Sequence, residues 1–218
     1  MNAMNQAVDA ILVMLVLTGF MLLGSSRLTA CIRAVGAQGI LLGLLAIAAQ
    51  DGELSATGIA MAITSAAVKG VVLPALLLRA MRQANTIREI EPLISYNLSI
   101  LLGGLGLALS LWLGGQLQLP TQPASSLFVP AACFTIFVGL MIIVSRRKAI
   151  TQVIGYLALE NGVYAFATAV ALQMPALVEL GILLDVFVGV FVMGIAIFHI
   201  GREFNHIDAD RLASLTDQ

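Results

Sequence analysis

The sequence predicts an all-α polytopic membrane protein with seven transmembrane helices, its N-terminus outside and its C-terminus in the cytoplasm. Three observations predict this fold class. Of the 218 residues, 60% are hydrophobic and 11% are charged, and the mean hydropathy is +1.00, a composition typical of chains that cross a bilayer several times. The apolar residues gather in seven runs of about twenty, the length that crosses the hydrocarbon core as a helix. Basic residues fall in alternate connections between these runs.

The seven runs cover residues 7–24, 31–49, 57–78, 93–114, 127–144, 149–172 and 176–200. Helices are expected because hydrocarbon offers backbone N–H and C=O groups no other partner, and the sequence lacks the alternating segments of a barrel. The first run has no basic residue before it and no small-residue cleavage pattern after it, so we expect an anchor and not a removable signal peptide. Four runs form an N-terminal part, 1–120, and three form a C-terminal part, 121–218.

The basic residues predict the orientation. Ten of the eleven lie in or beside odd-numbered connections, or after the last run: Arg27, Arg33, Arg79, Arg82, Arg88, Arg146, Arg147, Lys148, Arg202 and Arg211. The N-terminus and the even-numbered connections contain none. Because loops rich in Lys and Arg stay in the cytoplasm, we expect a multi-pass protein of the bacterial inner membrane with its C-terminus inside. The eleventh basic residue, Lys69, lies within the third run.

The second and fourth runs contain small residues suited to close helix packing, namely Gly36, Gly39 and Gly43, and Gly103, Gly104 and Gly106. The longest connection, 114–126, is too short to form a soluble domain that holds a flavin, a nucleotide or an iron–sulfur cluster. Cys31 and Cys133 lie far apart without His or Cys neighbours at ligand spacing, which indicates neither a disulfide framework nor a metal site. We therefore expect no cofactor in this chain.

Lys69 is too deep in the third run to reach either surface comfortably. Pro74 lies five residues later and has no N–H to give to the carbonyl of Gly70, so we expect the helix to kink there. An open carbonyl near a buried amine suggests a hydrated pocket. Lys69 either snorkels along a tilted helix or pairs with a carboxylate of this or a neighbouring subunit.

Two acidic residues, Glu160 and Asp185, lie within the sixth and seventh runs. They are almost equally distant from Gln173 at the intervening turn, so an antiparallel hairpin places them at about the same depth. Burial disfavours a charged carboxyl and a second carboxyl disfavours it further, so either group could hold a proton near neutral pH. A proton relay requires such groups. The alternative is a protonated Glu160 that hydrogen-bonds a backbone carbonyl, and the rotation of the two helices is left open.

Other polar residues surround these positions. Asn161, Tyr156 and Tyr164 could donate hydrogen bonds to Glu160, although a Tyr in such a place more often packs or anchors. Glu179 lies close to the turn and is either an outer-face carboxylate or part of the proton path. His199, near the cytoplasmic end of the last run, either passes protons to the surface or caps the helix.

The C-terminal third contains "GLMIIVSRRKAITQVIGYLALENGVYAF", "LLDVFVGVFVMGIAIFHI" and "NHIDADRL". It resembles the K subunit of respiratory complex I and the C subunit of multi-subunit sodium/proton antiporters. The resemblance rests on a Gly-Leu pattern, paired basic residues, a Glu in the second helix and an acidic residue in the third. It places Glu160 and Asp185 on the two acidic positions of those families, with Asp185 replacing a Glu.

With its Lys-containing third run, "AVKGVVLPALLLRAMR", the whole chain resembles component E of hydrogenase-4 and related formate hydrogenlyase complexes. The resemblance implies a membrane subunit of a complex I-related, group 4 nickel–iron hydrogenase. The implied partners are antiporter-like and complex I H-subunit-like membrane subunits, and peripheral hydrogenase and iron–sulfur subunits that carry the redox centres. The implied proton-path residues are Glu160, Asp185 and Lys69, to which we add His199, Tyr164 and Glu179.

Two functions remain open at this point. The first is a non-catalytic subunit of a redox-driven proton or sodium pump. The second is a subunit of a multi-subunit cation/proton antiporter, or an independent transporter, although no inverted repeat of interrupted helices is apparent. A retinal protein is rejected because the last run contains no Lys, and a self-contained enzyme lacks a nucleophile with a nearby base.

Overall fold

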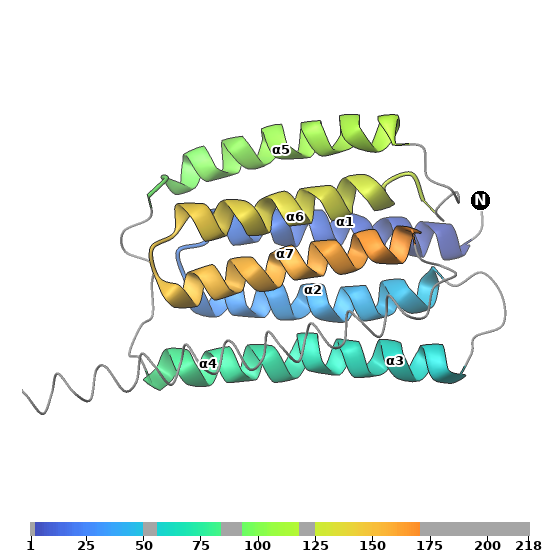
Figure 1. Ribbon diagram of the computed structural model, residues 1–218, viewed down its shortest axis with the longest axis horizontal. Helices are drawn as coiled ribbons and strands as arrows, with labels where there is room; N and C mark the ends of the chain where they lie inside the picture. The colour runs from blue at the N-terminus through green and yellow to red at the C-terminus, as the bar shows by residue number, and fades with distance from the viewer. Residues whose placement is uncertain (1–2, 50–55, 84–92, 118–124, 171–218) are drawn as a thin grey trace, which may run out of the picture.

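The computed structural model describes residues 3–49, 56–83, 93–117 and 125–170. The regular structure in these ranges is helical: α1 (Ala3–Gly24), α2 (Leu28–Ala48), α3 (Ala56–Ala67), the π-helix η1 (Val68–Val72), α4 (Leu73–Gln83), α5 (Tyr96–Gln116), α6 (Phe128–Ser145) and α7 (Ala149–Val170). The elements α3, η1 and α4 follow one another without a break and form a single rod (Figure 1). The all-α prediction is confirmed for this part of the chain.

Within the described ranges, five helical segments are long and apolar enough to cross a membrane: Asn5–Gly24, Leu28–Ala48, Gly58–Arg79, Tyr96–Gln116 and Phe128–Ser145. They coincide with the first five predicted runs. Helix α7 covers most of the sixth run and is not among these five, and the seventh run, 176–200, lies outside the described residues.

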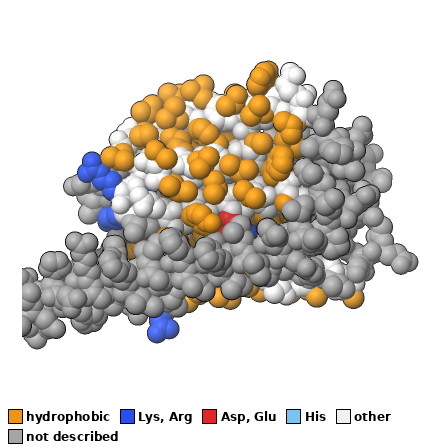
Figure 2. Space-filling model, in the orientation of Figure 1, with side chains coloured by type: hydrophobic (Ala, Val, Ile, Leu, Met, Phe, Trp, Pro, Cys, Tyr) orange, Lys and Arg blue, Asp and Glu red, His pale blue; other side chains and the backbone are white. Residues whose placement is uncertain are grey.

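The helices are apolar on exposed faces as well as buried ones, which is typical of helices surrounded by lipid. Leu101, Leu105 and Trp112 of α5 are each more than half exposed. Figure 2 shows the same property across the face formed by α5 and α6, where hydrophobic side chains dominate. The chain is therefore a membrane protein of several spans.

Helix α2 packs against more of the other described elements than any other helix. It packs against α1 on one side, against the α3–η1–α4 rod on another and against α7 on a third, while α6 packs against α1, α5 and α7 (Figure 1). Residues of η1 and α7 therefore meet beside α2, although the two elements are far apart in sequence.

The helix ends alternate as the basic residues predict. The α1–α2 and α6–α7 connections, the end of α4 and the start of α5 lie at the same end of the bundle, on the left in Figure 1. The basic residues next to these helix ends are Arg27, Arg79, Arg82, Arg146, Arg147 and Lys148. Most of the described positive charge is therefore at one end.

Arg146 differs from a solvated loop residue because it is buried. Its guanidinium donates hydrogen bonds to the carbonyl oxygens of Leu23 (3.1 Å) and Ile94 (3.2 Å), and it lies 4.4 Å from the centroid of the Tyr96 ring. Leu23 belongs to α1, Tyr96 is the first residue of α5, and Ile94 lies two residues before it. Arg146 therefore joins the ends of three helices, because it also follows α6 directly.

Glycines bring α2 against the α3–η1–α4 rod, as predicted. A Cβ atom added to Gly36, Gly39 or Gly43 would lie 2.9 Å from Pro74 Cγ, 2.6 Å from Lys69 Cβ and 2.5 Å from Ala66 Cβ, respectively. The prediction also holds for Gly103 and Gly106 of α5, which contact Leu23 and Phe137. It does not hold for Gly104 within the described residues, because a Cβ atom there would have none of them within 4 Å.

Glycines also fix the rotation of α7. A Cβ atom on Gly162 would lie 2.6 Å from the backbone nitrogen of Ile136, and one on Gly155 would lie 3.0 Å from the carbonyl oxygen of Gly139. Gly155 and Gly162 are seven residues apart, so they share one helix face, and this face is held against α6. Glu160 lies on a different face and is turned away from α6.

Candidate site: a buried ion pair at the centre of the bundle

Lys69 and Glu160 form an ion pair inside the protein. Lys69 Nζ donates to Glu160 Oε1 over 3.0 Å, and the two side chains are 3% and 4% exposed. Lys69 lies about halfway along the span Gly58–Arg79, and Glu160 lies about halfway along α7. The snorkelling alternative for Lys69 is therefore wrong, and the carboxylate that it pairs with belongs to this chain. The alternative in which Glu160 bonds only a backbone carbonyl is wrong as well.

The pair joins the two halves of the chain, since Lys69 belongs to the predicted N-terminal part and Glu160 to the C-terminal part. Two opposite charges at this depth lower the cost of burial for each other, whereas either charge alone would be expensive in a medium of low polarity. The carboxylate can also accept a proton and become neutral, which weakens its attraction to the ammonium. The arrangement therefore holds a carboxylate and an ammonium group in direct contact within the bundle.

The predicted irregularity beside Lys69 is present as a π-helical turn. The backbone N–H of Leu73 bonds the carbonyl of Val68, five residues earlier, immediately before Pro74. A proline cannot donate to the carbonyl four residues before it, so the wider turn relieves the local strain. Helix α2 covers this turn, because a Cβ atom on Gly36 would lie 3.1 Å from the oxygen of Gly70. Helix α2 therefore lies directly against this turn, and the hydrated pocket expected near Lys69 stays a prediction.

Tyr164 completes the surroundings of the ammonium. Its ring centroid lies 4.7 Å from Lys69 Nζ, within the range of a cation–π interaction. Tyr164 follows Glu160 by four residues and shares its helix face. The sequence left open whether this tyrosine donates a hydrogen bond or packs, and the structure shows that its ring lies beside the lysine. Tyr156 is exposed and lies at the surface of α7.

An amide pair lies next to the ion pair. Asn161 Nδ2 donates to Gln38 Oε1 over 3.4 Å, and both side chains are buried. Gln38 precedes Gly39, which contacts Lys69, and Asn161 follows Glu160. Gln38 was not predicted from the sequence. A polar amide inside the apolar run of α2 could have indicated a site residue, as a charged residue inside such a run does.

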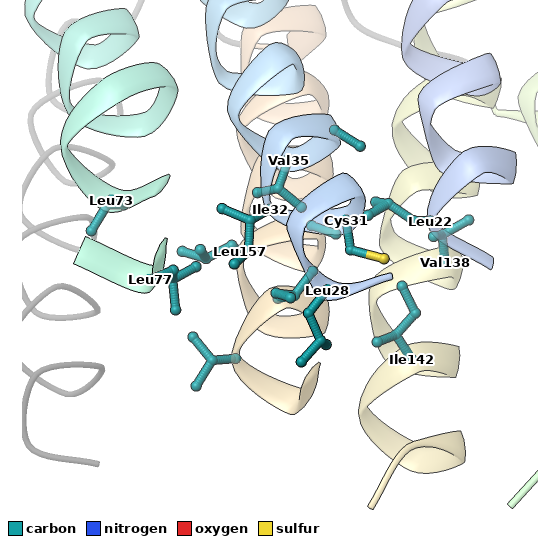
Figure 3. Packing of buried hydrophobic residues seen from close by; sticks show 14 of the residues in the cluster. Leu22, Leu28, Cys31, Ile32, Val35, Leu73, Leu77, Val138, Ile142 and Leu157 are labelled. Carbon is teal, nitrogen blue, oxygen red and sulfur yellow. The ribbon is translucent and has the colours of Figure 1, made fainter. Parts of the chain in front are cut away.

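Apolar clusters lie on both sides of this polar layer. One contains Leu28, Ile32 and Val35 of α2 with Ile154 and Leu157 of α7, and Figure 3 shows several of its members. The other contains residues further along both helices, including Leu42 and Leu45 of α2 and Ala165 and Ala169 of α7. Because positions 38, 160 and 161 fall between these two groups, the polar side chains form a layer within apolar packing.

Three predicted proton-path residues, Glu179, Asp185 and His199, lie outside the described residues. The predicted juxtaposition of Glu160 with Asp185 therefore stays a prediction. Within ranges 3–49, 56–83, 93–117 and 125–170, no three His, Cys, Asp or Glu side chains gather as metal ligands would.

Similarity to known proteins identifies the family. The uncharacterized protein Rv0085 of Mycobacterium tuberculosis is 34% identical to this chain over 209 residues, which are 93% of each protein. The chain belongs to the Rv0085 family. No family model matches the chain, and no solved structure matches it.

A second similarity is shorter. Hydrogenase-4 component E of Escherichia coli K12 is 36% identical over 77 residues, which are 35% of this chain and 36% of component E, and the Shigella flexneri protein gives the same values. The residues quoted above predict a resemblance to component E over the full length, whereas the match spans about a third of both proteins. The Rv0085 family is therefore a distant relative of component E.

Proposed function

We propose that this chain is a membrane-arm subunit of a complex I-related, group 4 nickel–iron hydrogenase or formate hydrogenlyase complex, and that its buried ion pair contributes to redox-driven translocation of protons or sodium ions. The observation that carries the proposal is the Lys69–Glu160 contact at 3.0 Å in the middle of two neighbouring helices. The partial similarity to hydrogenase-4 component E supports the type of complex.

A purely structural role explains the pair less well. A buried ion pair is often no more stabilising than well-packed apolar side chains of the same volume, so stability alone gives little reason to have one. Ionisable side chains inside a membrane are usually functional for this reason. Lys69 also lies in a π-helical turn, a deviation that is frequent at functional sites.

In the proposed mechanism, a proton that reaches Glu160 neutralises the carboxylate and weakens its hold on Lys69. The Tyr164 ring then remains beside the ammonium at 4.7 Å and limits the cost of leaving it without an anionic partner. Loss of the proton restores the pair. The charge state of Glu160 is in this way coupled to the position of Lys69 on the neighbouring rod.

The proposal includes the finer topology predicted from the sequence. The chain has seven spans in a bacterial inner membrane, the N-terminus outside and the C-terminus cytoplasmic. The seventh span, 176–200, places Asp185 near the depth of Glu160, with Glu179 and His199 toward opposite ends. Antiporter-like and complex I H-subunit-like subunits are the membrane partners, and peripheral hydrogenase and iron–sulfur subunits carry the redox centres.

Purification of the tagged chain in mild detergent tests the type of complex. We expect a large nickel-binding subunit and antiporter-like subunits to copurify. Copurification of antiporter-like subunits without nickel would instead support a cation/proton antiporter. Ion movement by the chain alone in vesicles would support an independent transporter.

The role of the pair is tested in the assembled complex. We expect Glu160→Gln to leave assembly intact and to impair ion movement, because glutamine keeps the shape but cannot exchange a proton. Thr135→Val is the matched control, since the buried Thr135 hydroxyl bonds only the carbonyl of Ala131 in its own helix among the contacts described. Normal pumping by the Glu160→Gln complex would remove Glu160 from the path.

A further inference from the structure

Among the residues that the structure describes, the amide nitrogen of Gln38 has no hydrogen-bond partner, although the side chain is 0% exposed. Its oxygen accepts from Asn161 Nδ2, so the orientation of the carboxamide is set from one side and the NH₂ group is directed elsewhere inside the protein. Buried amide donors almost always have a partner, and an ordered water is the usual one when no side chain serves.

The chemistry of the surroundings selects the ligand. An N–H donor repels a cation, so the group does not bind a sodium ion. An anion is disfavoured because the carboxylate of Glu160 belongs to the residue next to Asn161. The clusters on either side of the layer are apolar except for Cys31 and Tyr164, and neither of these two side chains bonds this nitrogen. A small neutral acceptor remains, and water is the only one available throughout a membrane protein.

The position of Gln38 connects this nitrogen with the ion pair. Gln38 precedes Gly39, the residue against which Lys69 packs, and its amide partner Asn161 follows Glu160. Glu160 and Asn161 are thus consecutive on α7, and their partners lie on two elements that pack against each other, Lys69 on η1 and Gln38 on α2.

We propose that Gln38 Nε2 binds an internal water molecule beside the Lys69–Glu160 pair, and that this water delivers protons to Glu160 and removes them. The water accepts a hydrogen bond from Gln38 and keeps both of its own O–H groups for neighbours. A proton moves by transfer to the water oxygen and release of another proton from it, so no other reactant is consumed. The delivery step rests on the proposed function, whereas the binding of water does not.

The binding site is tested on the wild-type protein in lipid bilayers, with ¹⁵N in the glutamine side chains. The resonance of the Gln38 carboxamide is assigned by its disappearance in Gln38→Met. We expect magnetisation to pass from water to this NH₂ group, as it does to that of the exposed Gln152. A Gln38 resonance that receives no transfer from water would overturn the site. The transfer from water is measured on the wild-type protein, and the variant serves only to assign the resonance.

The delivery step is tested by ion movement in the assembled complex. We expect Gln38→Met to lose ion movement to the same extent as Glu160→Gln, while Thr135→Val retains it. Loss in Glu160→Gln with full activity in Gln38→Met overturns the delivery step and leaves the proposed function standing. Full activity in both variants overturns the proposed function and the delivery step together, while water transfer to Gln38 in the wild type still supports the binding site.

Discussion

The mutual dependence of Lys69 and Glu160 can be measured with a double-mutant cycle. Lys69→Met keeps the length of the side chain without the charge, and Glu160→Gln keeps the shape of the carboxyl group. At 3.0 Å, two unit charges attract each other by about 5.5 kcal/mol when the effective dielectric constant is about 20. Much of this attraction is offset by the cost of removing both charges from water, so the net contribution of the intact pair is small.

The single variants nevertheless lose stability, because each leaves one charge buried without its partner, at a cost of about 3–5 kcal/mol. The double variant has no buried charge at this position and should lose less than either single variant. The expected coupling between the two substitutions is therefore on the order of 3 kcal/mol.

The assay is reversible unfolding of the purified protein in bilayer-like detergent mixtures, with the free energy of unfolding measured for the wild type, both single variants and the double variant. Thr135→Val combined with Glu160→Gln is the control cycle, and its effects should add, because the Thr135 hydroxyl bonds within its own helix. If the losses of Lys69→Met and Glu160→Gln also add, the two side chains do not depend on each other and the description of the site is wrong.

Three further substitutions test the packing around the site. Gly39→Val should lose at least about 1–3 kcal/mol of unfolding free energy, because the valine side chain would collide with the backbone of η1. In Gly104→Val no described residue lies in the way, so its unfolding free energy should stay within about 1 kcal/mol of the wild-type value. Arg146→Ala should lose about 2 kcal/mol or more of unfolding free energy, because two carbonyl groups lose a charged donor. Arg82→Ala, at an exposed position, should change the unfolding free energy little, and equal losses in the two variants would refute the role of Arg146 in joining the helix ends. Tyr164→Leu should lose about 0.5–2 kcal/mol more unfolding free energy than Tyr164→Phe, because only phenylalanine keeps a ring beside the Lys69 ammonium, and equal losses in the two variants would refute the role of the ring.

The helical spans follow from the sequence because a medium without hydrogen-bonding partners permits few other structures. The irregular turn at Lys69 could also be predicted, since Pro74 lacks the N–H that its helix needs. The partner of Lys69 could not, because it depends on which helices become neighbours and how each is rotated. Glycines such as Gly39 and Gly162 decide those contacts, and their effect appears only when the facing backbone is known.

The amide layer was missed for a different reason. Charges in hydrocarbon attract attention because of their cost, while Gln38 is neutral and is less expensive to bury. For Gly104 the opposite happened: close packing was expected, and none of the described residues packs against it. A glycine in an apolar run does not reveal whether anything packs against it. Both errors come from treating residue type as a substitute for the neighbours that surround it.

The separation of the paired charges along the chain constrains how the protein is made. Lys69 precedes Glu160 by 91 residues, so the ribosome delivers the lysine to the insertion machinery well before its partner exists. Inserting a lone lysine costs about 2.5–3.5 kcal/mol, which the Leu, Ile and Val side chains of the same segment must offset at roughly 0.3–0.6 kcal/mol each. A nascent chain that stops short of α7 keeps that ammonium unmatched by Glu160. Pairing with Glu160 thus comes only after α7 has been synthesised and packs beside α2.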